Sequence, residues 1–207
     1  LRRLVGSEMC IRDRYDFDSA NVFAFLQKYG LEKEFKLNIE QNHAILAKHS
    51  FEHEIAYALS NDIFGSIDIN RGDYLVGWDT DQFPNNVEEL VLPFYYIFKN
   101  GGFSSGGLNM DAKIRRQSID PEDLFYAHIG SMDTCARTLI AVEKMINDGG
   151  YENFLKQRYE LWASEKQLMT SMSLEDIHKN VIDKNINPQP KSGRQEYLEN
   201  LINSFVE

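Results

Sequence analysis

The sequence predicts an α/β protein whose strands alternate with helices. Two observations carry this prediction: short apolar segments of strand length recur along the first 120 residues, and amphipathic segments bounded by turn residues separate them. Strands alternating with helices favour parallel pairing through right-handed crossovers. From about residue 121 the strand pattern stops, and a helical tail follows.

The first predicted helix begins at Asp18 or Ser19, because either side chain can cap it, and ends at Gly30. Its apolar face consists of Val22, Phe25, Leu26 and Tyr29. The segment 35–40, FKLNIE, follows and is apolar enough for a buried strand. Ser50 can then cap a second helix, which runs through Ile55, Ala58 and Leu59.

The segment 65–70, GSIDIN, is the next predicted strand. A helix over 86–99 comes later and ends at Gly101-Gly102; Pro93 inside it should cost roughly 3 kcal/mol unless it kinks the helix. The segment 106–113, GGLNMDAK, is the third short apolar stretch.

Helices are predicted in the tail at 131–148, 152–163, 173–185 and 194–206, with Ser131, Gly149 and Ser173 as end signals. We expect their apolar faces to pack on the α/β part or on another subunit. The first fourteen residues, LRRLVGSEMCIRDR, carry four arginines without a clear period, and we leave them out of the fold as a possible artefact. The predicted division is therefore 1–14, 15–120 and 121–207.

The composition narrows the class of protein. A chain of 207 residues with 43% hydrophobic residues suits one globular unit. The net charge of -10 argues against a nucleic-acid partner. Cys10 and Cys135 are far apart and have no metal-ligand spacing, which fits a reducing cytoplasm. No apolar run approaches the ~20 residues that span a bilayer, so we expect no membrane association.

Acidic side chains gather where the predicted strands end. In parallel α/β folds, the carboxyl ends of the strands line the ligand site. Glu40 closes the first strand, Asp68 lies in the second and Asp111 at the end of the third segment. The loop after Asp68 adds a D-x-D pair, and the first strand is followed by a histidine. The candidate metal ligands are Glu40, His43, Asp68, Asp79, Asp81 and Asp111.

Each of these residues has a simpler explanation when taken alone. An aspartate after a strand often caps the next helix, a D-x-D pair is usually a turn, and a single histidine is more often structural than a ligand. Their coincidence at one end of three strands favours a metal centre. Carboxylates with one imidazole and no thiolate suit Mg²⁺ or Mn²⁺ and admit Co²⁺. Six ligands are too many for one ion, so two divalent ions sharing a carboxylate are expected.

Other chemistries are not indicated. The sequence has no G-x-G-x-x-G, P-loop, G-x-S-x-G or H-E-x-x-H pattern. A calcium loop starting at Asp79 would put Pro84 where glycine is needed and Leu90 where a glutamate is needed.

Long motifs in the sequence resemble the second half of the xylose isomerases of the longer bacterial class. The resemblance covers residues from Tyr15 almost to the C-terminus, through the motifs KLNIEQNHAILAKHSFEHE, GSIDINRGDYLVGWDTDQFP, GGLNMDAKIRRQS, DLFYAHIGSMDTCAR and SGRQEYLENL. It implies a TIM (β/α)8 barrel, of which this chain supplies the last part, about three βα units, plus a helical tail for association into dimers or tetramers.

The resemblance also implies roles for the candidate ligands. Glu40 would bridge two metal ions, Asp68 and Asp111 would complete the protein ligands of the first, and His43, Asp79 and Asp81 would hold the second. The implied reaction is a metal-assisted hydride shift that interconverts D-xylose and D-xylulose, and also glucose and fructose, without an organic cofactor.

Part of the family's site has no counterpart here. The fourth ligand of the first ion, the lysine near the sugar carbonyl, and the histidine and aspartate of ring opening would precede this chain in the family. We therefore expect no catalytic residue within the chain and no activity for the chain alone. Two alternatives stay open: an inactive half-barrel that binds at most one divalent ion, and a metal-dependent hydrolase of phosphate esters, which the acidic charge disfavours.

Overall fold

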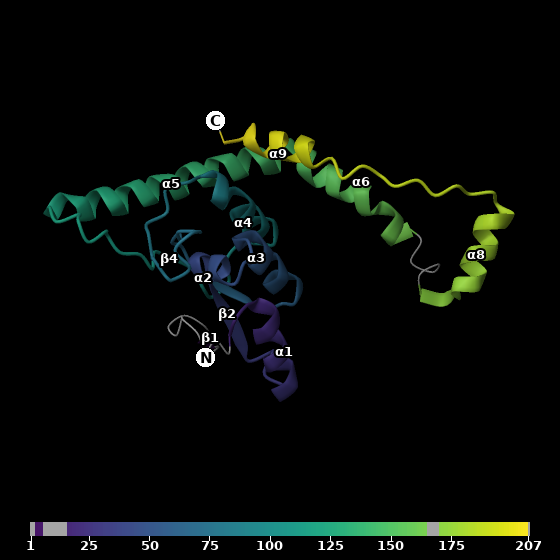
Figure 1. Ribbon diagram of the computed structural model, residues 1–207, viewed down its shortest axis with the longest axis horizontal. Helices are drawn as coiled ribbons and strands as arrows, with labels where there is room; N and C mark the ends of the chain where they lie inside the picture. Colours follow the sequence, from purple (N-terminus) through teal and green to yellow (C-terminus); the bar gives the residue numbers. More distant parts are fainter. Residues whose placement is uncertain (1–2, 6–15, 165–169, 207) are drawn as a thin grey trace. The chain divides into compact units, whose positions relative to one another are not determined.

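The computed structural model of the chain describes residues 3–5, 16–164 and 170–206 (Figure 1). Contacts divide the chain into two compact units, residues 1–143 and 144–205. The first unit holds one fully parallel sheet with the strand order β1-β2-β3-β4. Its strands are β1 (Arg3–Val5), β2 (Phe35–Glu40), β3 (Phe64–Asp68) and β4 (Leu108–Asn109). The predicted α/β class with parallel pairing is confirmed.

Helix α1 (Ser19–Tyr29) begins and ends where the sequence predicts. The Asp18 carboxylate accepts a hydrogen bond from the backbone N–H of Asn21 at 2.7 Å, which satisfies one of the free donors of the first turn. Gly30 follows the last turn with φ of 65°, a left-handed conformation that favours glycine. A short turn over residues 31–34 then leads into β2.

Helices α3 (Phe51–Ser60) and α4 (Glu88–Lys99) connect the successive strands, and α3 packs against both α1 and α4 (Figure 1). Helix α4 continues through Pro93, which is buried. The proline removes one hydrogen bond of the helix interior. We attribute the helix's tolerance of this loss to burial of the apolar face around Pro93. Three of its residues, Leu90, Val91 and Ile97, are completely buried.

Three elements of the first unit differ from the prediction. Helix α2 (Gln41–Leu46) was not predicted, because six residues are too few to show a helical period. Strand β4 is only two residues long, although the apolar segment predicted it over 106–113. Strand β1 comes from the segment 1–14 that we left out, and it pairs with β2 from Arg3–Phe35 to Val5–Leu37. The other residues of 1–14 lie outside the described part.

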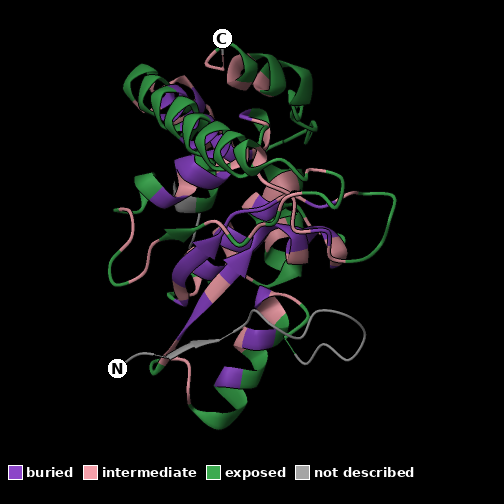
Figure 2. Cartoon of the chain, turned by 90° about the vertical axis from the view of Figure 1, so that its left-hand side faces the viewer, coloured by how far each residue is buried: buried purple, intermediate pink, exposed green. Residues whose placement is uncertain are grey.

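The core of the first unit lies around β2 and β3 (Figure 2). Ile67 and Ile69 are 0% exposed, as are Ile55 and Ile63 beside the sheet. Consecutive residues of β3 are buried, so both faces of this strand are covered, as is usual in parallel sheets. The strand ends are therefore held rigidly by packing.

The tail is helical, as predicted. Its helices in the described residues are α5 (Pro121–Asp148), α6 (Gly150–Ser164), α8 (Leu174–Asp183) and α9 (Gln195–Asn203). Helix α5 begins at Pro121 and not at the predicted residue 131. Ser131 lies inside the helix, where its hydroxyl donates to the Ala127 carbonyl, so it does not cap the helix. Gly149, with φ of 69°, ends α5 as expected.

The second unit is held by contacts between α6 and α9. The rings of Phe154 and Tyr197 have centroids 6.1 Å apart, and the Arg158 guanidinium donates to the carbonyl of Ser192 at 3.0 Å. Among the described residues, no helix is both long and apolar enough to cross a membrane.

We expect the substitution Ile67→Ala to destabilise the protein by about 2–5 kcal/mol, because it leaves a cavity beneath the strand that carries Asp68. Leu75→Ala is the matched control, since Leu75 is 96% exposed and its loss should cost less than about 0.5 kcal/mol. Urea unfolding of the two variants measures the difference in their free energies of unfolding. Equal unfolding midpoints would contradict the placement of Ile67 in the core.

Candidate metal centre

Three strand ends bring acidic and amide side chains to one edge of the sheet. Glu40 is the last residue of β2 and pairs in register with Asp68, the last residue of β3. Asp68 in turn pairs with Asn109 of β4, and Asp111 follows two residues later. The parallel register thus produces the convergence that the sequence predicts.

Glu40, Asp68 and Asp111 form a first group of possible metal ligands. Each offers one carboxylate oxygen, and these oxygens lie within 4.8 Å of one another. Amide donors hold Asp68: Asn38 donates to its Oδ2 at 2.6 Å and Asn109 to its Oδ1 at 3.2 Å. The carboxylate of Asp68 is therefore oriented before any ligand arrives.

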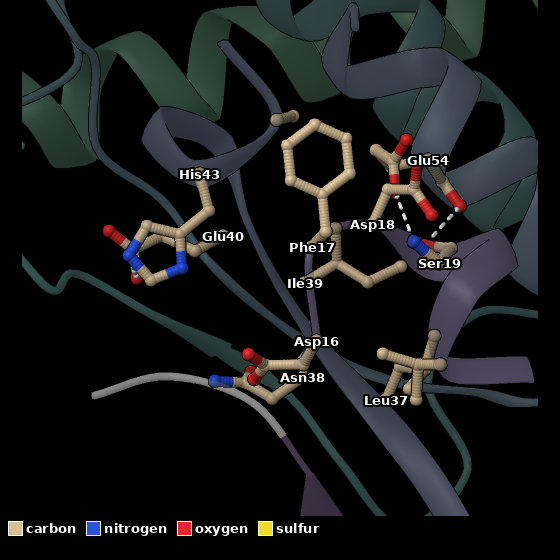
Figure 3. A pocket seen from close by; sticks show the side chains of 12 residues that line it. Asp16, Phe17, Asp18, Ser19, Leu37, Asn38, Ile39, Glu40, His43 and Glu54 are labelled. Atoms are coloured by element: carbon tan, nitrogen blue, oxygen red, sulfur yellow. Dashed lines mark hydrogen bonds and ion pairs between the residues drawn. The ribbon is translucent and has the colours of Figure 1, made fainter. Parts of the chain in front are cut away.

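Glu40, His43 and Asp79 form a second group, which shares Glu40 with the first. Helix α2 starts directly after Glu40 and places His43 one turn further on. The His43 Nε2 lies 3.1 Å from Glu40 Oε2 and 3.1 Å from Asp79 Oδ2. Figure 3 shows the side chains of Glu40 and His43 next to each other at the end of β2.

Asp81 is the candidate ligand that belongs to neither group. It forms an ion pair with Lys113 and lies against Asp79. The D-x-D pair is not simply extended, because Asp81 has a left-handed φ of 41°. Arg115 fixes this turn by donating to the carbonyls of Thr80 and Asp81 at 2.7 and 2.9 Å.

The loop that carries Asp79 and Asp81 is closed at its base. Arg71 and Gln82 exchange two backbone hydrogen bonds, of 2.8 and 3.0 Å. Asp79 of this loop accepts a hydrogen bond from the Asn42 amide of helix α2. A Cβ on Gly72 would lie 1.8 Å from the Asn42 Oδ1, so only glycine leaves room for this amide.

The carboxylates are crowded in a way that a cation would relieve. The pKa of Glu40 is raised from 4.5 to about 8, mainly by burial; the charges of Asp79 and Asp111 add to the rise, and His43 and the hydrogen bond from Asn70 oppose it. Burial and the charges of Asp68 and Asp79 also raise the pKa of Asp111. Together the groups favour bound protons or a bound cation over free negative charge.

The donor set fits hard divalent ions. Two groups made of carboxylates and one imidazole, joined by Glu40, offer the ligands that Mg²⁺ and Mn²⁺ prefer and that Co²⁺ accepts. The cavity of about 50 Å³ next to Glu40 and His43 is far smaller than the roughly 300 Å³ of a typical ligand pocket. The cavity directly beside these two ligands is therefore too small to hold a sugar-sized molecule.

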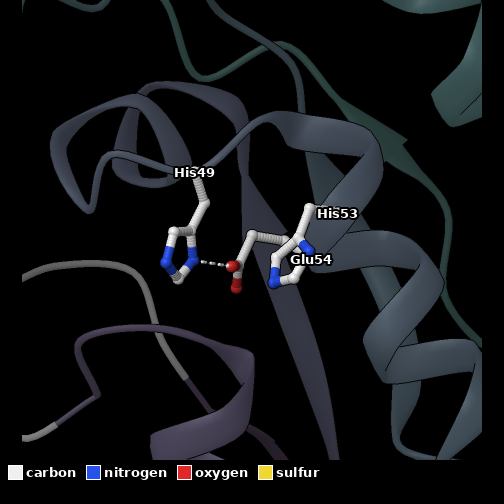
Figure 4. A group of neighbouring side chains, drawn as sticks. All are labelled: His49, His53 and Glu54. Atoms are coloured by element: carbon white, nitrogen blue, oxygen red, sulfur yellow. Dashed lines mark hydrogen bonds and ion pairs between the residues drawn. The ribbon is translucent and has the colours of Figure 1, made fainter. Parts of the chain in front are cut away.

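His49, His53 and Glu54 form another group with donor atoms in reach of one another (Figure 4). Glu54 is buried and already accepts two hydrogen bonds, from the Ser19 N–H at 2.6 Å and from His49 Nδ1 at 2.5 Å. Two helix N-termini, of α1 and α3, lie beside this carboxylate, and their partial positive charge disfavours a cation. We assign the group a structural role in joining the two helices.

The sequence analysis did not identify the asparagine side chains that surround the metal ligands. Asn42 and Asn70 are almost fully buried and hydrogen-bond to Asp79 and Glu40. Their positions gave a signal, because each follows a strand-end carboxylate by two residues. An asparagine in a loop, however, indicates a turn more often than a support for a ligand.

Comparison with known proteins places the chain beside sugar isomerases. Residues 155–206 match the family described as the XylA2 C-terminal domain. The chain is 57% identical over 197 residues to the xylose isomerases of Brucella canis and Brucella anthropi, and 58% identical over 198 residues to that of Ruegeria sp.. Each alignment covers 94% of this chain and 45% of the relative, so the chain spans less than half the length of these curated relatives.

We expect Glu40→Gln to change how the stability of the metal-free protein depends on pH. The folded-state pKa of Glu40, about 8, lies above its ordinary value of 4.5. The protonated form therefore stabilises the fold fully below pH 4.5, and this contribution is lost as the pH rises through 8. Glutamine does not titrate, so the variant should gain stability relative to the parent protein between pH 5 and about 8.5.

Urea unfolding in EDTA at pH 5, 7 and 8.5 measures this difference. A stability gap between Glu40→Gln and the parent protein that stays constant with pH would show that Glu40 is not forced toward its protonated form.

We expect Gly72→Ala to destabilise the protein by about 1–3 kcal/mol, because the new methyl group displaces the buried Asn42 amide. Gly107→Ala is the control, since a Cβ there meets nothing within 4 Å. Both variants are compared by urea unfolding. Equal stability of the two would mean that the loop accommodates the methyl group without moving Asn42.

Proposed function

The chain corresponds to the C-terminal region of xylose isomerases, and from this premise we propose that the whole protein interconverts D-xylose and D-xylulose with two divalent cations. Glucose and fructose would be a second substrate pair. The observation that carries the proposal is that the two groups of ligands share one carboxylate, that of Glu40, which is buried. Two ions joined by one carboxylate are a common arrangement for polarising two oxygens of one substrate.

The fold proposed for the whole protein is a TIM barrel, of which this chain forms the last part. The strand order β1-β2-β3-β4 follows the sequence order without reversal. A singly wound barrel has this property, whereas a doubly wound sheet reverses its order at a switch point. The position of the ligands at the carboxyl ends of the strands also agrees with a barrel site.

In this proposal Glu40, Asp68 and Asp111 hold one ion, and Glu40, His43, Asp79 and Asp81 hold the other. The bound ions would polarise the sugar oxygens and stabilise the negative charge that develops on them during the shift of a hydride between C1 and C2. Mg²⁺, Mn²⁺ and Co²⁺ are the proposed cofactors, because the donors are mainly carboxylates. No organic cofactor is proposed.

The residues of this chain would supply charge and orientation. His43 would hold a cation through Nε2, the nitrogen that faces Glu40 and Asp79. Asn38 and Asn109 hold Asp68 in one orientation. Asp81 would have to exchange its ion pair with Lys113 for the cation, and Lys113 is exposed enough to move away. The chain thus provides most of the metal ligands and the geometry between them.

The remaining machinery would come from the rest of the whole protein. The resemblance assigns the fourth ligand of the first ion, the lysine and the ring-opening histidine and aspartate to the part that precedes this chain. The small cavity beside Glu40 supports the same division. For the chain alone we propose at most weak binding of one ion, by the group whose ligands are all present, and no turnover.

Association of subunits is proposed for the tail. Helix α5 exposes several large apolar side chains: Leu124, Phe125, Tyr126, Ile129, Met132, Leu139 and Ile140. Such a series on one helix is typical of a surface that is covered in an assembly. We propose a homodimer or homotetramer and a cytoplasmic location for the whole protein.

We expect the whole protein to convert xylose to xylulose in a coupled assay with Mg²⁺, Mn²⁺ or Co²⁺. The substitution Asp111→Asn should lower kcat by roughly 100-fold or more, since stabilisation worth several kcal/mol depends on the metal centre. Asp73→Asn is the control, because Asp73 lies in the loop between Arg71 and Gln82 but in neither group of ligands, and its Oδ1 accepts from the Leu75 N–H. The chain alone should show no turnover.

Absence of turnover by the whole protein with all three ions would overturn the proposed function. Turnover by the chain alone would overturn the proposed division of the catalytic machinery.

A further inference from the structure

Asn70 occupies the centre of the hydrogen bonds that support the metal ligands. It follows β3 by two residues and is 0% exposed. Its Nδ2 donates to Glu40 Oε1 at 2.6 Å and to the Asp111 carbonyl at 2.9 Å. Its Oδ1 accepts from the Asn42 N–H at 2.9 Å. One buried amide therefore contacts three segments that carry candidate ligands.

The orientation of this amide follows from its partners. A backbone N–H such as that of Asn42 can only donate, so it must face the Oδ1 of Asn70. A carbonyl and a carboxylate without a proton can only accept, so they must face the two N–H bonds of Nδ2. A flipped amide would lose the hydrogen bonds to the Asn42 N–H and to the Asp111 carbonyl whether or not Glu40 is protonated, which leaves one stable orientation.

The contact with Glu40 fixes the carboxylate that the two groups share. Oε1 of Glu40 is held by Asn70 at 2.6 Å, while Oε2 lies 3.1 Å from His43 Nε2. Rotation of the carboxylate about its last bond would break the hydrogen bond to Asn70. Asn70 is neutral, so it orients Glu40 without cancelling the charge of the carboxylate. A lysine or arginine in its place would cancel that charge.

The other two contacts extend this support. The Asn42 N–H belongs to the first turn of α2, the helix that carries His43, and the Asp111 carbonyl belongs to the segment after β4. Asn70 thus links the end of β3 to both neighbouring strand ends. A change at this residue would reach both groups of ligands at once.

We propose that Asn70 is a positioning residue, which sets the Glu40 carboxylate and the Asp111 segment for the binding of both cations. This inference rests on the proposed function, because it presupposes that the two groups bind metal. It makes a distinct claim, however: the affinity for the ions depends on an uncharged residue that does not touch them. Partners of metal ligands typically contribute 10–100-fold to metal affinity.

The test is a Co²⁺ titration of the whole protein by calorimetry, with unfolding in EDTA measured in parallel. Asn70→Ala should weaken the binding of both ions by about 10–100-fold. Asn70→Ser should weaken it less, because one hydroxyl can donate to one of the two acceptors. Asn61→Ala is the control: its amide donates to the Tyr57 carbonyl at 2.8 Å, at the end of α3 and away from the ligands.

A purely structural role would lower the stability in EDTA but leave the Co²⁺ affinity unchanged, as expected for Asn61→Ala. Co²⁺ affinity like that of the parent protein in both Asn70 variants would therefore overturn the positioning role and leave the proposed function standing. Absence of Co²⁺ binding by the parent protein would instead overturn the proposed function. If Asn70→Ala does not fold in EDTA, Asn70→Ser decides the question.

Discussion

Burial of the Glu40 carboxylate beside other acids is the constraint on which the rest of this site depends. The parallel register brings Glu40 and Asp68 side by side, and the loops add Asp79 and Asp111 within reach of the same carboxylate. Burial, together with these neighbouring acids, raises the pKa of Glu40 to about 8. A fold that relied on its protein contacts alone would gain by replacing one of these acids, so the arrangement is best explained by a positive charge that binds among them.

The supports of the ligands are consistent with that explanation. Most of the carboxylates are held by amides, from Asn38, Asn42, Asn70 and Asn109, whose donors orient an oxygen without neutralising it. Asp81 pairs with Lys113 instead, and the Asn70 amide contacts the backbone carbonyl of Asp111 and not its carboxylate. The centre is thus organised largely by neutral hydrogen-bond donors, which orient the ligands and leave the carboxylates free to exchange bound protons for a divalent cation. Rigid packing under β3 keeps this geometry in place.

The sequence predicted the parts of this site that follow from strand ends. Glu40, Asp68 and Asp111 come together because parallel strands end at one edge, a rule that needs no further information. Helix α2 is too short for a periodic signal, and the left-handed turn at Asp81 depends on contacts with Arg115, 34 residues away. The role of Asn70 depends on three partners that are distant in sequence. Such contacts appear only once the chain is folded, and β1 likewise becomes recognisable only through its pairing with β2.

Anomalous diffraction from crystals of the whole protein grown with Mn²⁺ tests the central claim most directly. The account predicts two peaks that share Glu40 as a ligand, one beside Asp68 and Asp111 and the other beside His43 and Asp79. Manganese peaks elsewhere, or none within coordination distance of Glu40, would contradict it.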